Sequence, residues 1–276
     1  MLHKEWKPYF PAHPVTLPIF DFEFKRKVDE QLVNKLTTFI KKSLDERLKL
    51  GYDKIIVGYS GGVDSTVSML LLKRALPSNS IAIQIEFDNA SGPSPDTKFS
   101  MQVADTVGIK HTLINATELY KKHLALFDTN SIVAKTHLRS RLAVNILFQF
   151  ADNNNALVLD TTDKSEAILH LYEESFRGHL SPLKSLYRTE IHDLADYFKM
   201  PELKDKPAGC PDLTNADALG ALTQEVDPLL YLMVEKRLPP DELIKKYKLD
   251  EVWLKNLARR INEQPLRTQG VTLELD

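Results

Sequence analysis

The chain of 276 residues contains a single cysteine, Cys210. One thiol excludes an internal disulfide framework and any zinc site built from several thiolates, so a reducing compartment such as the cytoplasm is expected. The first residues lack the charged, apolar and small-residue pattern of a secretory signal. No uninterrupted apolar run is long enough to cross a bilayer, and we therefore expect no membrane partner.

The sequence also lacks an excess of charge of either sign. Its 36 lysines and arginines nearly balance 38 aspartates and glutamates, which gives a formal net charge of −2. Because no general positive field is present, recruitment of DNA, RNA or an acidic membrane surface is not expected. With 43% hydrophobic and 27% charged residues, the composition is that of an ordinary globular protein with a sizeable core.

The chain does contain a regular alternation of apolar strands and amphipathic helices. Short apolar runs at 55–58, 80–87, 110–114 and 156–159 are typical of strands that are covered on both faces. Apolar residues at helical spacing predict helices at 27–50, after 62, and at 95–107, 132–151, 187–198, 229–236, 240–247 and 251–263. This order predicts an α/β fold, a doubly wound, Rossmann-like parallel sheet flanked by helices, with a helical C-terminal portion.

The division of the chain follows from its proline-rich segments. Prolines and aromatic residues alternate in residues 1–26, which predicts an extended arm packed on the domain or on a second subunit. We expect residues 27–276 to form one domain. Within it, residues 204–215 are rich in helix-breaking residues and predict a loop that becomes ordered over a ligand.

The most informative stretch turns from a buried strand through Ser60-Gly61-Gly62-Val63-Asp64-Ser65 into a helix. Free N–H groups at a helix start form an anion site together with the helix dipole, and paired glycines let backbone approach a phosphate. Asp64 would repel phosphates unless a divalent cation bridged them, so the stretch predicts a magnesium-held pyrophosphate. For the Gly-Gly pair alone, the alternative is a plain strand-to-helix turn.

The loop resembles the pyrophosphate loop of the N-type ATP pyrophosphatases, enzymes that split ATP between its α and β phosphates. The second half of the chain is similar, in order and spacing, to ammonia-dependent NAD synthetase. The matching residues are Arg139, Arg141, Thr161, Lys164-Ser165-Glu166, Ser181-Pro182-Leu183, Leu186-Tyr187-Arg188-Thr189-Glu190, Asp217, Leu219-Gly220 and Asp227. Together they extend the likeness over roughly residues 27–235.

This resemblance implies a ligase in which nicotinic acid adenine dinucleotide attacks the α-phosphate of ATP and ammonia then displaces AMP. It implies that Asp64 and Glu166 hold Mg²⁺, that Asp64 and Arg139 are catalytic, and that Arg139 and Arg141 contact the substrate. ATP and its pyrophosphate would contact Ser60, Gly61, Gly62, Val63, Asp64, Ser65, Thr161, Lys164 and Arg188. The resemblance also implies a homodimer whose seam helps to form the dinucleotide site.

Simpler interpretations remain for several of these side chains. Glu166 can be a solvated carboxylate favoured by the helix dipole, and Lys164 a plain lysine of the same turn. Arg139 and Arg141 can form surface ion pairs, more readily for Arg141 because residues two apart face different sides of a helix.

The sequence departs from the family pattern around the acceptor and nucleotide pockets. Asp160 stands for glycine, Lys135 for asparagine, Leu138 for alanine, Arg188 for lysine, Glu190 for glutamine and Ala218 for an acid. Two other functions therefore stay open: an adenylating enzyme that acts on another carboxylate, and a nucleotide-binding module without catalysis.

Overall fold

The computed structural model describes residues 14–88, 93–127, 131–171, 178–206, 209–210 and 213–263. Its strands are β1 (Lys54–Gly58), β2 (Ser80–Glu86), β3 (Lys110–Asn115), β4 (Ala156–Leu159), β5 (Gly209–Cys210) and β6 (Leu213–Thr214). Its α-helices are α1 (Glu30–Asp45), α2 (Val63–Ala75), α3 (Pro95–Val107), α4 (Thr117–Leu124), α5 (Ile132–Asn153), α6 (Lys164–Leu169), α7 (Arg188–Tyr197), α8 (Asn215–Leu219), α9 (Thr223–Leu230), α10 (Pro240–Tyr247) and α11 (Glu251–Glu263). Shorter helical turns are η1 (Leu48–Leu50), η2 (Pro201–Asp205) and the π-helical η3 (Tyr231–Glu235).

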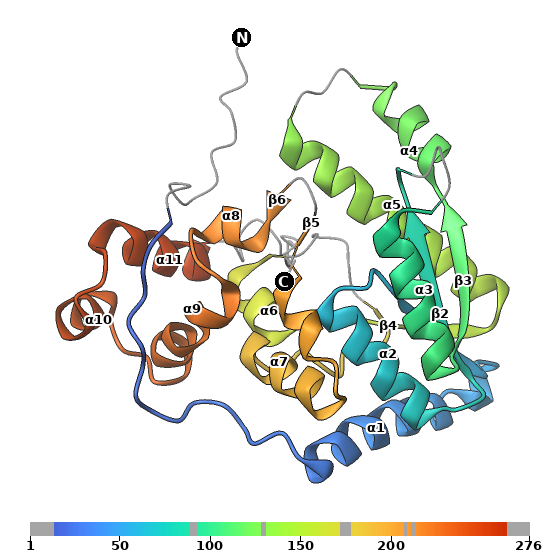
Figure 1. Ribbon diagram of the computed structural model, residues 1–276, viewed down its shortest axis with the longest axis horizontal. Coiled ribbons are helices and arrows are strands. Elements are labelled where there is room, and N and C mark those ends of the chain that lie inside the picture. Colours follow the sequence, from blue (N-terminus) through green and yellow to red (C-terminus); the bar gives the residue numbers. More distant parts are fainter. Residues whose placement is uncertain are drawn as a thin grey trace, which may run out of the picture.

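Four of the strands form a parallel sheet in the order β3-β2-β1-β4. The chain moves outward from β1 through β2 to β3 and then returns to the other side of β1 for β4. The predicted doubly wound fold is thus confirmed (Figure 1). The strand order reverses between β1 and β4, and in sheets of this kind ligands bind at the carboxyl ends of the strands at this point.

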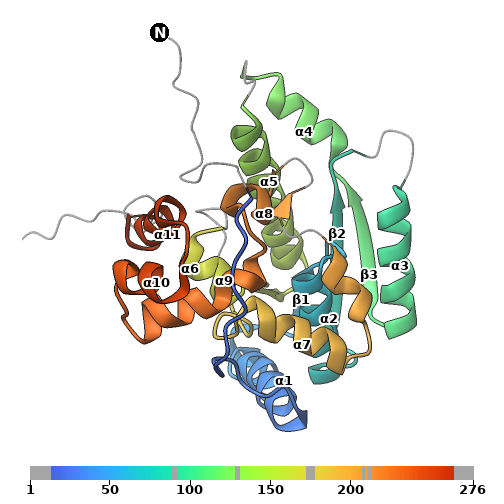
Figure 2. The ribbon, with the colours of Figure 1, turned by 60° about the vertical axis from the view of Figure 1, so that its left-hand side comes forward.

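Both faces of the sheet are covered, which explains the continuous apolar run of β1. Ile55 and Val57 pack into a core shared with α1, α2 and α7, whereas Ile56 packs on the opposite face against Leu147 and Ala151 of α5. All three β1 side chains are fully buried. Figure 2 shows α3 and α5 on opposite sides of β2 and β3. The apolar half of α5 therefore belongs to the core of this chain.

The structure differs from the sequence predictions at several helix boundaries. The helix expected at 27–50 is α-helical only in α1 and continues through η1 to Gly51, whose φ is +91°. The helix expected from 229 begins at Thr223 and contains Pro228. Pro228 has no N–H to donate to the carbonyl of Gln224. This carbonyl instead accepts a hydrogen bond from the Thr189 hydroxyl at 3.4 Å. The segment at 204–215 includes part of η2 and the β5–β6 hairpin, while 207–208 and 211–212 lie outside the described residues.

The arm is extended over its described part, residues 14–28, and residues 1–13 lie outside the description. It runs past α9–α11 and then reaches α1 (Figure 1, blue). Val15 N donates to Gly220 O at 2.8 Å, and Phe20, Phe22 and Phe24 contact aromatic rings of the C-terminal helices and of residue 187. The arm thus packs on the domain itself. None of the described helices is long and apolar enough to cross a membrane.

Candidate functional site

The predicted phosphate loop connects β1 to α2 at the carboxyl edge of the sheet. Gly61 has a φ of +78°, and Gly62 is the N-cap residue of α2. Ser65 Oγ accepts from Ser60 N at 3.2 Å and donates to Gly62 O at 3.1 Å, so its hydroxyl closes the turn. Gly62 has no side chain with which to cap α2, so the first N–H groups of the helix donate no hydrogen bond to a side chain of the N-cap residue.

Gly61 is favoured by its backbone angle, and a side chain there would also displace a neighbouring hydroxyl. A Cβ atom added to it would lie 2.0 Å from Oγ of Ser100, which is buried on α3. Lys206 Nζ donates to Gly61 O at 3.2 Å and lies 4.8 Å from the centroid of the Phe99 ring. Lys206 brings a positive charge to the loop from 145 residues away, and no local sequence signal marks it.

We expect Gly61→Ala to destabilise the protein by about 3 kcal/mol or more, because a left-handed φ costs about 1–2 kcal/mol and the Ser100 overlap adds to it. Gly108→Ala is the matched control, since Gly108 has a φ of +70° with nothing within 4 Å of the added Cβ. Urea unfolding should show a loss of about 1–2 kcal/mol for the control. Equal losses for the two variants would show that the Ser100 contact costs nothing.

A buried arginine lies at the centre of the site. Arg188, the first residue of α7, is 1% exposed, and its guanidinium forms ion pairs with three carboxylates. Nη1 contacts Asp64 Oδ2, Nη2 donates to Glu166 Oε1 at 2.9 Å, and Nε lies 3.0 Å from Asp163 Oδ2. The two residues expected to hold Mg²⁺ are thus brought together, with Arg188 between them. Asp163, which the motif analysis did not single out, is the third carboxylate.

These charges perturb one another because the cluster is largely shielded from water. Burial raises the pKa of the Glu166 carboxyl to about 7, although the Arg188 charge acts in the opposite direction. Burial likewise raises the pKa of Asp163 well above its usual range. Burial lowers the pKa of Arg188, but the charges of Asp163, Asp64 and Glu166 outweigh it and leave that pKa well above its ordinary value. With three carboxylates around one guanidinium, the cluster favours an additional cation.

Within the described part of the chain, one carboxylate oxygen of the cluster is also free of protein hydrogen bonds, as a metal ligand would be. Asp64 Oδ1 is buried and accepts no hydrogen bond from the described residues. Oxygen atoms of this kind are the ligands that Mg²⁺ prefers, and Mg²⁺ is commonly held by one or two carboxylates together with substrate phosphates. Within the described ranges, no group of three or more His, Cys, Asp or Glu side chains could hold a metal ion alone. Asp64 and Glu166 therefore suit a metal that arrives with a nucleotide.

Another buried carboxylate, that of Asp227, stabilises the start of α7. Asp227 of α9 accepts bonds from the Ser165 hydroxyl at 2.5 Å, from Thr189 N at 2.8 Å and from the Thr189 hydroxyl at 2.5 Å. Ser165 Oγ in turn accepts from Arg188 N at 2.9 Å. The motif residues Ser165, Thr189 and Asp227 thus join α6, α7 and α9 behind Arg188. Burial raises the pKa of Asp227 to about 6, although these hydrogen bonds act in the opposite direction.

The raised pKa of Asp227 predicts a pH-dependent stability. A carboxyl whose folded pKa exceeds its unfolded pKa binds more protons when folded, so its contribution is complete below pH 3.8 and is lost as the pH rises through about 6. At about 1.4 kcal/mol per pKa unit, this shift corresponds to about 3 kcal/mol. We expect the unfolding free energy of the wild type, minus that of Asp227→Asn, to fall by about that amount between pH 4 and 7 in urea titrations. A difference that rises with pH would contradict the assignment.

The other predicted residues lie farther from the carboxylate cluster or have other partners. Lys164 pairs with Glu235 and lies 4.3 Å from the centroid of the Tyr187 ring. Thr161 is half-buried directly after β4, at the same edge as the loop. Arg139 of α5 donates to Asp88 Oδ2 at 2.6 Å and lies 5.0 Å from the centroid of the Tyr120 ring. Arg141 is exposed.

One departure from the family pattern has a structural explanation. Asp160, which stands where glycine is usual, is buried, and its carboxylate accepts from Thr162 N at 2.9 Å and from the Ser181 hydroxyl at 2.8 Å. A Cβ added to Gly178 would lie 2.6 Å from Asp160 N, so the backbone of residue 178 passes close to this turn. Asp160 thus stabilises the turn after β4, and its carboxylate is engaged within the chain.

A doubly wound parallel sheet with a glycine-containing turn between its first strand and the next helix is the architecture of α/β proteins that bind nucleotides. Within that class the family is also shown. The NAD synthase family model matches residues 32–269, and the chain belongs to this family.

Known relatives and solved structures agree with this assignment. The chain is 30% identical over 232 residues to the NH(3)-dependent NAD(+) synthetase of Methanocaldococcus jannaschii, covering 79% of this chain and 86% of that protein. It is 31% identical to the protein of the same name from Chlorobaculum tepidum, covering 72% and 74% respectively. An NH3-dependent NAD synthetase from Campylobacter jejuni shares the fold with a TM-score of 0.72 at 19% identity, covering 91% of this chain and all of that one. An NMN synthetase from Francisella tularensis has a TM-score of 0.73 at 19% identity, with the same coverage.

Proposed function

We propose that this protein is an ammonia-dependent NAD synthetase. It is a ligase that uses ATP and Mg²⁺ to convert nicotinic acid adenine dinucleotide to NAD through an acyl-adenylate, with release of AMP and pyrophosphate. The observation that carries the proposal is the position of Asp64. Asp64 lies in the first turn of α2, next to the phosphate loop. Its carboxylate and that of Glu166, which follows the neighbouring strand β4, both contact the guanidinium of Arg188. Membership of the family and the activity for which its relatives are named support the same reaction.

The residues of the loop have distinct tasks in this reaction. Amides at the start of α2 and the hydroxyl of Ser60 bind the pyrophosphate as its negative charge develops, while Ser65 closes the turn by donating to Gly62 O and Lys206 adds a positive charge beside Gly61. Asp64 and Glu166 would hold Mg²⁺, which neutralises phosphate charge when bound. Arg188 keeps these two carboxylates in place. Its three guanidinium nitrogens already contact carboxylates, so we assign it to positioning rather than to direct contact with phosphate.

The acceptor side of the site is assigned to residues at the ends of the other strands. Arg139, held by Asp88 after β2, provides the charge that orients the reacting carboxylate, and Thr161 after β4 contacts the nucleotide. We place Arg141 and Lys164 at the periphery of the bound substrates, because Arg141 is exposed and Lys164 is paired with Glu235.

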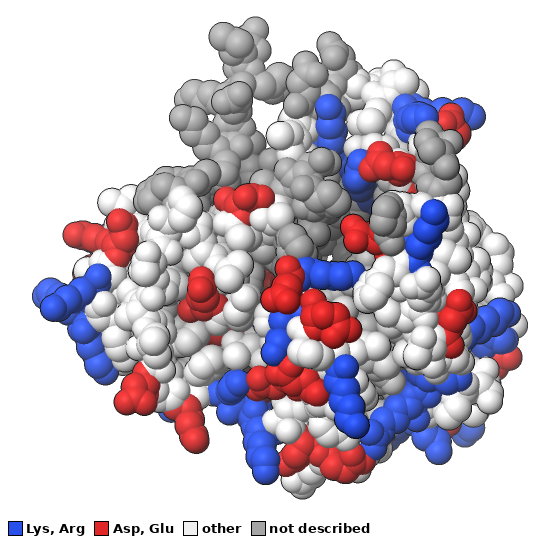
Figure 3. Space-filling view, viewed as in Figure 1, with Lys and Arg blue, Asp and Glu red and all other residues white. Residues whose placement is uncertain are grey.

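We further propose that the protein is a homodimer in a reducing compartment such as the cytoplasm. Leu126, Phe127 and Ile132, where α4 is followed by α5, expose 70%, 71% and 54% of their surface. Exposed apolar side chains this close together in the chain are candidates for a surface that another subunit covers. On the face shown in Figure 3, positive and negative side chains are interspersed, which favours small-molecule substrates over nucleic acid. Light scattering during size-exclusion chromatography tests the dimer.

The reaction is tested by incubating the protein with ATP, Mg²⁺, nicotinic acid adenine dinucleotide and ammonium, and measuring NAD, AMP and pyrophosphate. We expect all three products in equal amounts. Parallel reactions contain nicotinic acid mononucleotide instead of the dinucleotide, or glutamine instead of ammonium. Pyrophosphate release only with another carboxylate would identify a related adenylating enzyme, and ATP binding without pyrophosphate release would identify a binding module. Formation of ADP would contradict the mechanism.

A further inference from the structure

The arm contacts the helix that carries Arg188, although the arm precedes the part of the chain that the family model matches. The match to the family begins at residue 32, whereas Lys25 and Arg26 of the arm both form hydrogen bonds with side chains of α7. Phe24 also contacts the ring of Tyr187, the N-cap residue of α7, with ring centroids 5.9 Å apart. The segment 24–26 is thus docked at the end of α7 that faces the site.

Glu190 is the receiving group for the arm. Its side chain is 1% exposed, and Oε1 accepts from Arg26 N at 2.8 Å. Arg26 Nη1 lies 3.2 and 3.3 Å from the two carboxylate oxygens and donates to Ser185 O at 2.8 Å. Oε2 accepts from Tyr187 N at 2.7 Å, as expected for a capping box. The cation that compensates this buried carboxylate therefore comes from the arm.

Three side chains accept hydrogen bonds from the backbone N–H groups at the start of α7. Glu190 binds Tyr187 N, Ser165 binds Arg188 N, and Asp227 binds Thr189 N. Because Arg188 contacts Asp64 and Glu166, any displacement of this turn is transmitted to both carboxylates. Of the three supports, only the one at Glu190 depends on the arm.

We propose that Arg26 is a positioning residue for the active site: it compensates Glu190, fixes the first turn of α7, and thereby holds Arg188 and the Asp64–Glu166 pair ready for magnesium and ATP. The proposal rests on the proposed function for its kinetic test, and its structural part is independent of the reaction. It assigns to the arm a role in substrate binding in addition to packing.

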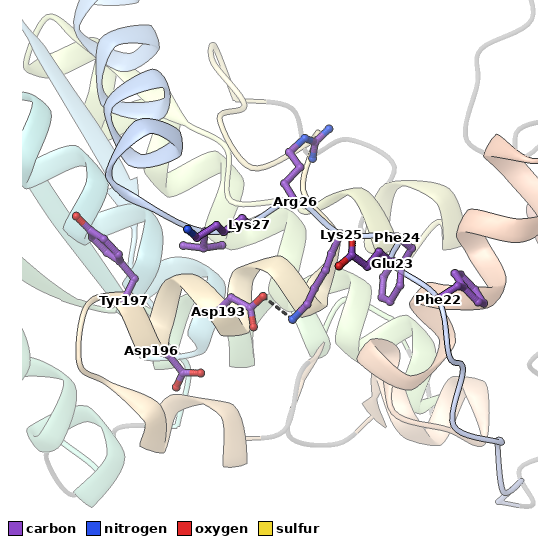
Figure 4. A pocket seen from close by; sticks show the side chains of 10 residues that line it. Phe22, Glu23, Phe24, Lys25, Arg26, Lys27, Asp193, Asp196 and Tyr197 are labelled. Atoms are coloured by element: carbon purple, nitrogen blue, oxygen red, sulfur yellow. Dashed lines mark hydrogen bonds and ion pairs between the residues drawn. The ribbon is translucent and has the colours of Figure 1, made fainter.

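The arm supplies its own control in the neighbouring residue. Lys25 Nζ donates to Asp193 Oδ2 at 2.6 Å in a groove of ≈ 700 Å³ between the arm and α7. Figure 4 shows this pair and shows Arg26 leaving the segment in another direction. The Lys25–Asp193 pair is 39% and 31% exposed and lies beyond the first turn of the helix. It tethers the same arm to the same helix without compensating a buried charge.

The experiment compares Arg26→Met, Arg26→Lys and Lys25→Met with the wild type. For Arg26→Met we expect the KM for MgATP to rise about fivefold to tenfold, which corresponds to the net contribution of about one ordinary hydrogen bond. We expect kcat to change less than about twofold, because bound MgATP restores the position of the carboxylates. Arg26→Lys should stay near the wild type, since one nitrogen, Nη1, makes all three side-chain contacts of Arg26 to Glu190 and Ser185. Lys25→Met should leave KM unchanged.

Two measurements do not depend on turnover. Binding of Mn²⁺, used as a probe for Mg²⁺, is followed by electron paramagnetic resonance, and hydrogen exchange is measured for the peptide that contains residues 187–190. Arg26→Met should weaken Mn²⁺ binding and speed exchange in this peptide, and the two controls should do neither. A lower Tm with unchanged KM, Mn²⁺ affinity and exchange would reduce Arg26 to a packing residue and overturn the proposal. So would equal effects of Arg26→Met and Lys25→Met. Absence of NAD formation by the wild type would instead contradict the proposed function, while exchange and Mn²⁺ binding would still test the coupling.

Discussion

Asp64→Asn is expected to lower the rate of NAD formation by roughly 10²–10³-fold, the range seen when one group that stabilises developing charge is removed. The amide keeps the shape of the side chain but removes the negative charge beside the phosphate loop. Under the proposed function, Asp64 Oδ1, which accepts no bond from the described residues, would ligate Mg²⁺. The measurement is pyrophosphate release at saturating substrates, together with the dependence of the rate on Mg²⁺ concentration.

The control for this variant is Asp196→Asn. Asp196 lies on α7, the helix that carries Arg188, but it is 48% exposed and pairs with Lys204 at the surface. We expect it to retain the wild-type rate, because exposed ion pairs of this kind contribute about 0–1 kcal/mol. Asp64→Asn should also remain folded, since it removes one of the three negative charges around Arg188. A rate within about fivefold of the wild type would show that Asp64 has no part in the chemistry.

The parts of the molecule that could be predicted from the sequence are those with local signals. The four sheet strands are short apolar runs, and strand, turn and helix follow one another within the stretch around Ser60. The phosphate loop combines backbone angle, hydroxyls and a carboxylate in six consecutive residues, so pattern alone located it. In contrast, α4 is only eight residues long, too short for a clear helical period, and was not predicted.

The partners of Arg188 could not be predicted, because they depend on packing between distant segments. Arg188 and Asp64 are 124 positions apart and meet because α7 packs beside α2. The motif predicts that Arg188 contacts ATP phosphate, which stays a prediction, and the structure shows its guanidinium among three carboxylates. Asp163 was missed although a local signal existed, since an acidic residue followed by Glu166 three positions later is the pattern of a capping box.

The cluster around Arg188 joins the two halves of the site. Asp64 belongs to the helix after β1, whereas Asp163 and Glu166 follow β4, and α7 brings the guanidinium between these two neighbouring strand ends. Three carboxyl groups share one guanidinium in a shielded place, so without a further cation they carry an excess of negative charge or bind protons, as the raised pKa values of Asp163 and Glu166 indicate. Binding of a divalent cation is therefore favoured here. When the cation is absent, the stability of the folded protein depends on Arg188.

Arg188→Met is therefore expected to lower the unfolding free energy of the metal-free protein by about 3–5 kcal/mol, the range observed when one partner of a buried ion pair is removed. Methionine fills much of the volume but leaves three carboxylates without their cation. Urea unfolding at pH 7.5, with and without Mg²⁺, gives the measurement. Because a divalent cation can compensate the same carboxylates, Mg²⁺ should stabilise Arg188→Met more than it stabilises the wild type.

Arg188→Lys is the matched variant, and it remains informative if the methionine variant does not fold. An ammonium keeps the positive charge but cannot make the three contacts that the planar guanidinium makes through Nε, Nη1 and Nη2. We expect its stability to lie between those of the wild type and Arg188→Met, with a smaller response to Mg²⁺ than the methionine variant. A loss below about 1 kcal/mol for Arg188→Met would place this guanidinium in the class of surface ion pairs, in conflict with its burial. An equal response to Mg²⁺ in all three proteins would show that the cation binds away from Asp64 and Glu166, and that the positioning role assigned to Arg188 is wrong.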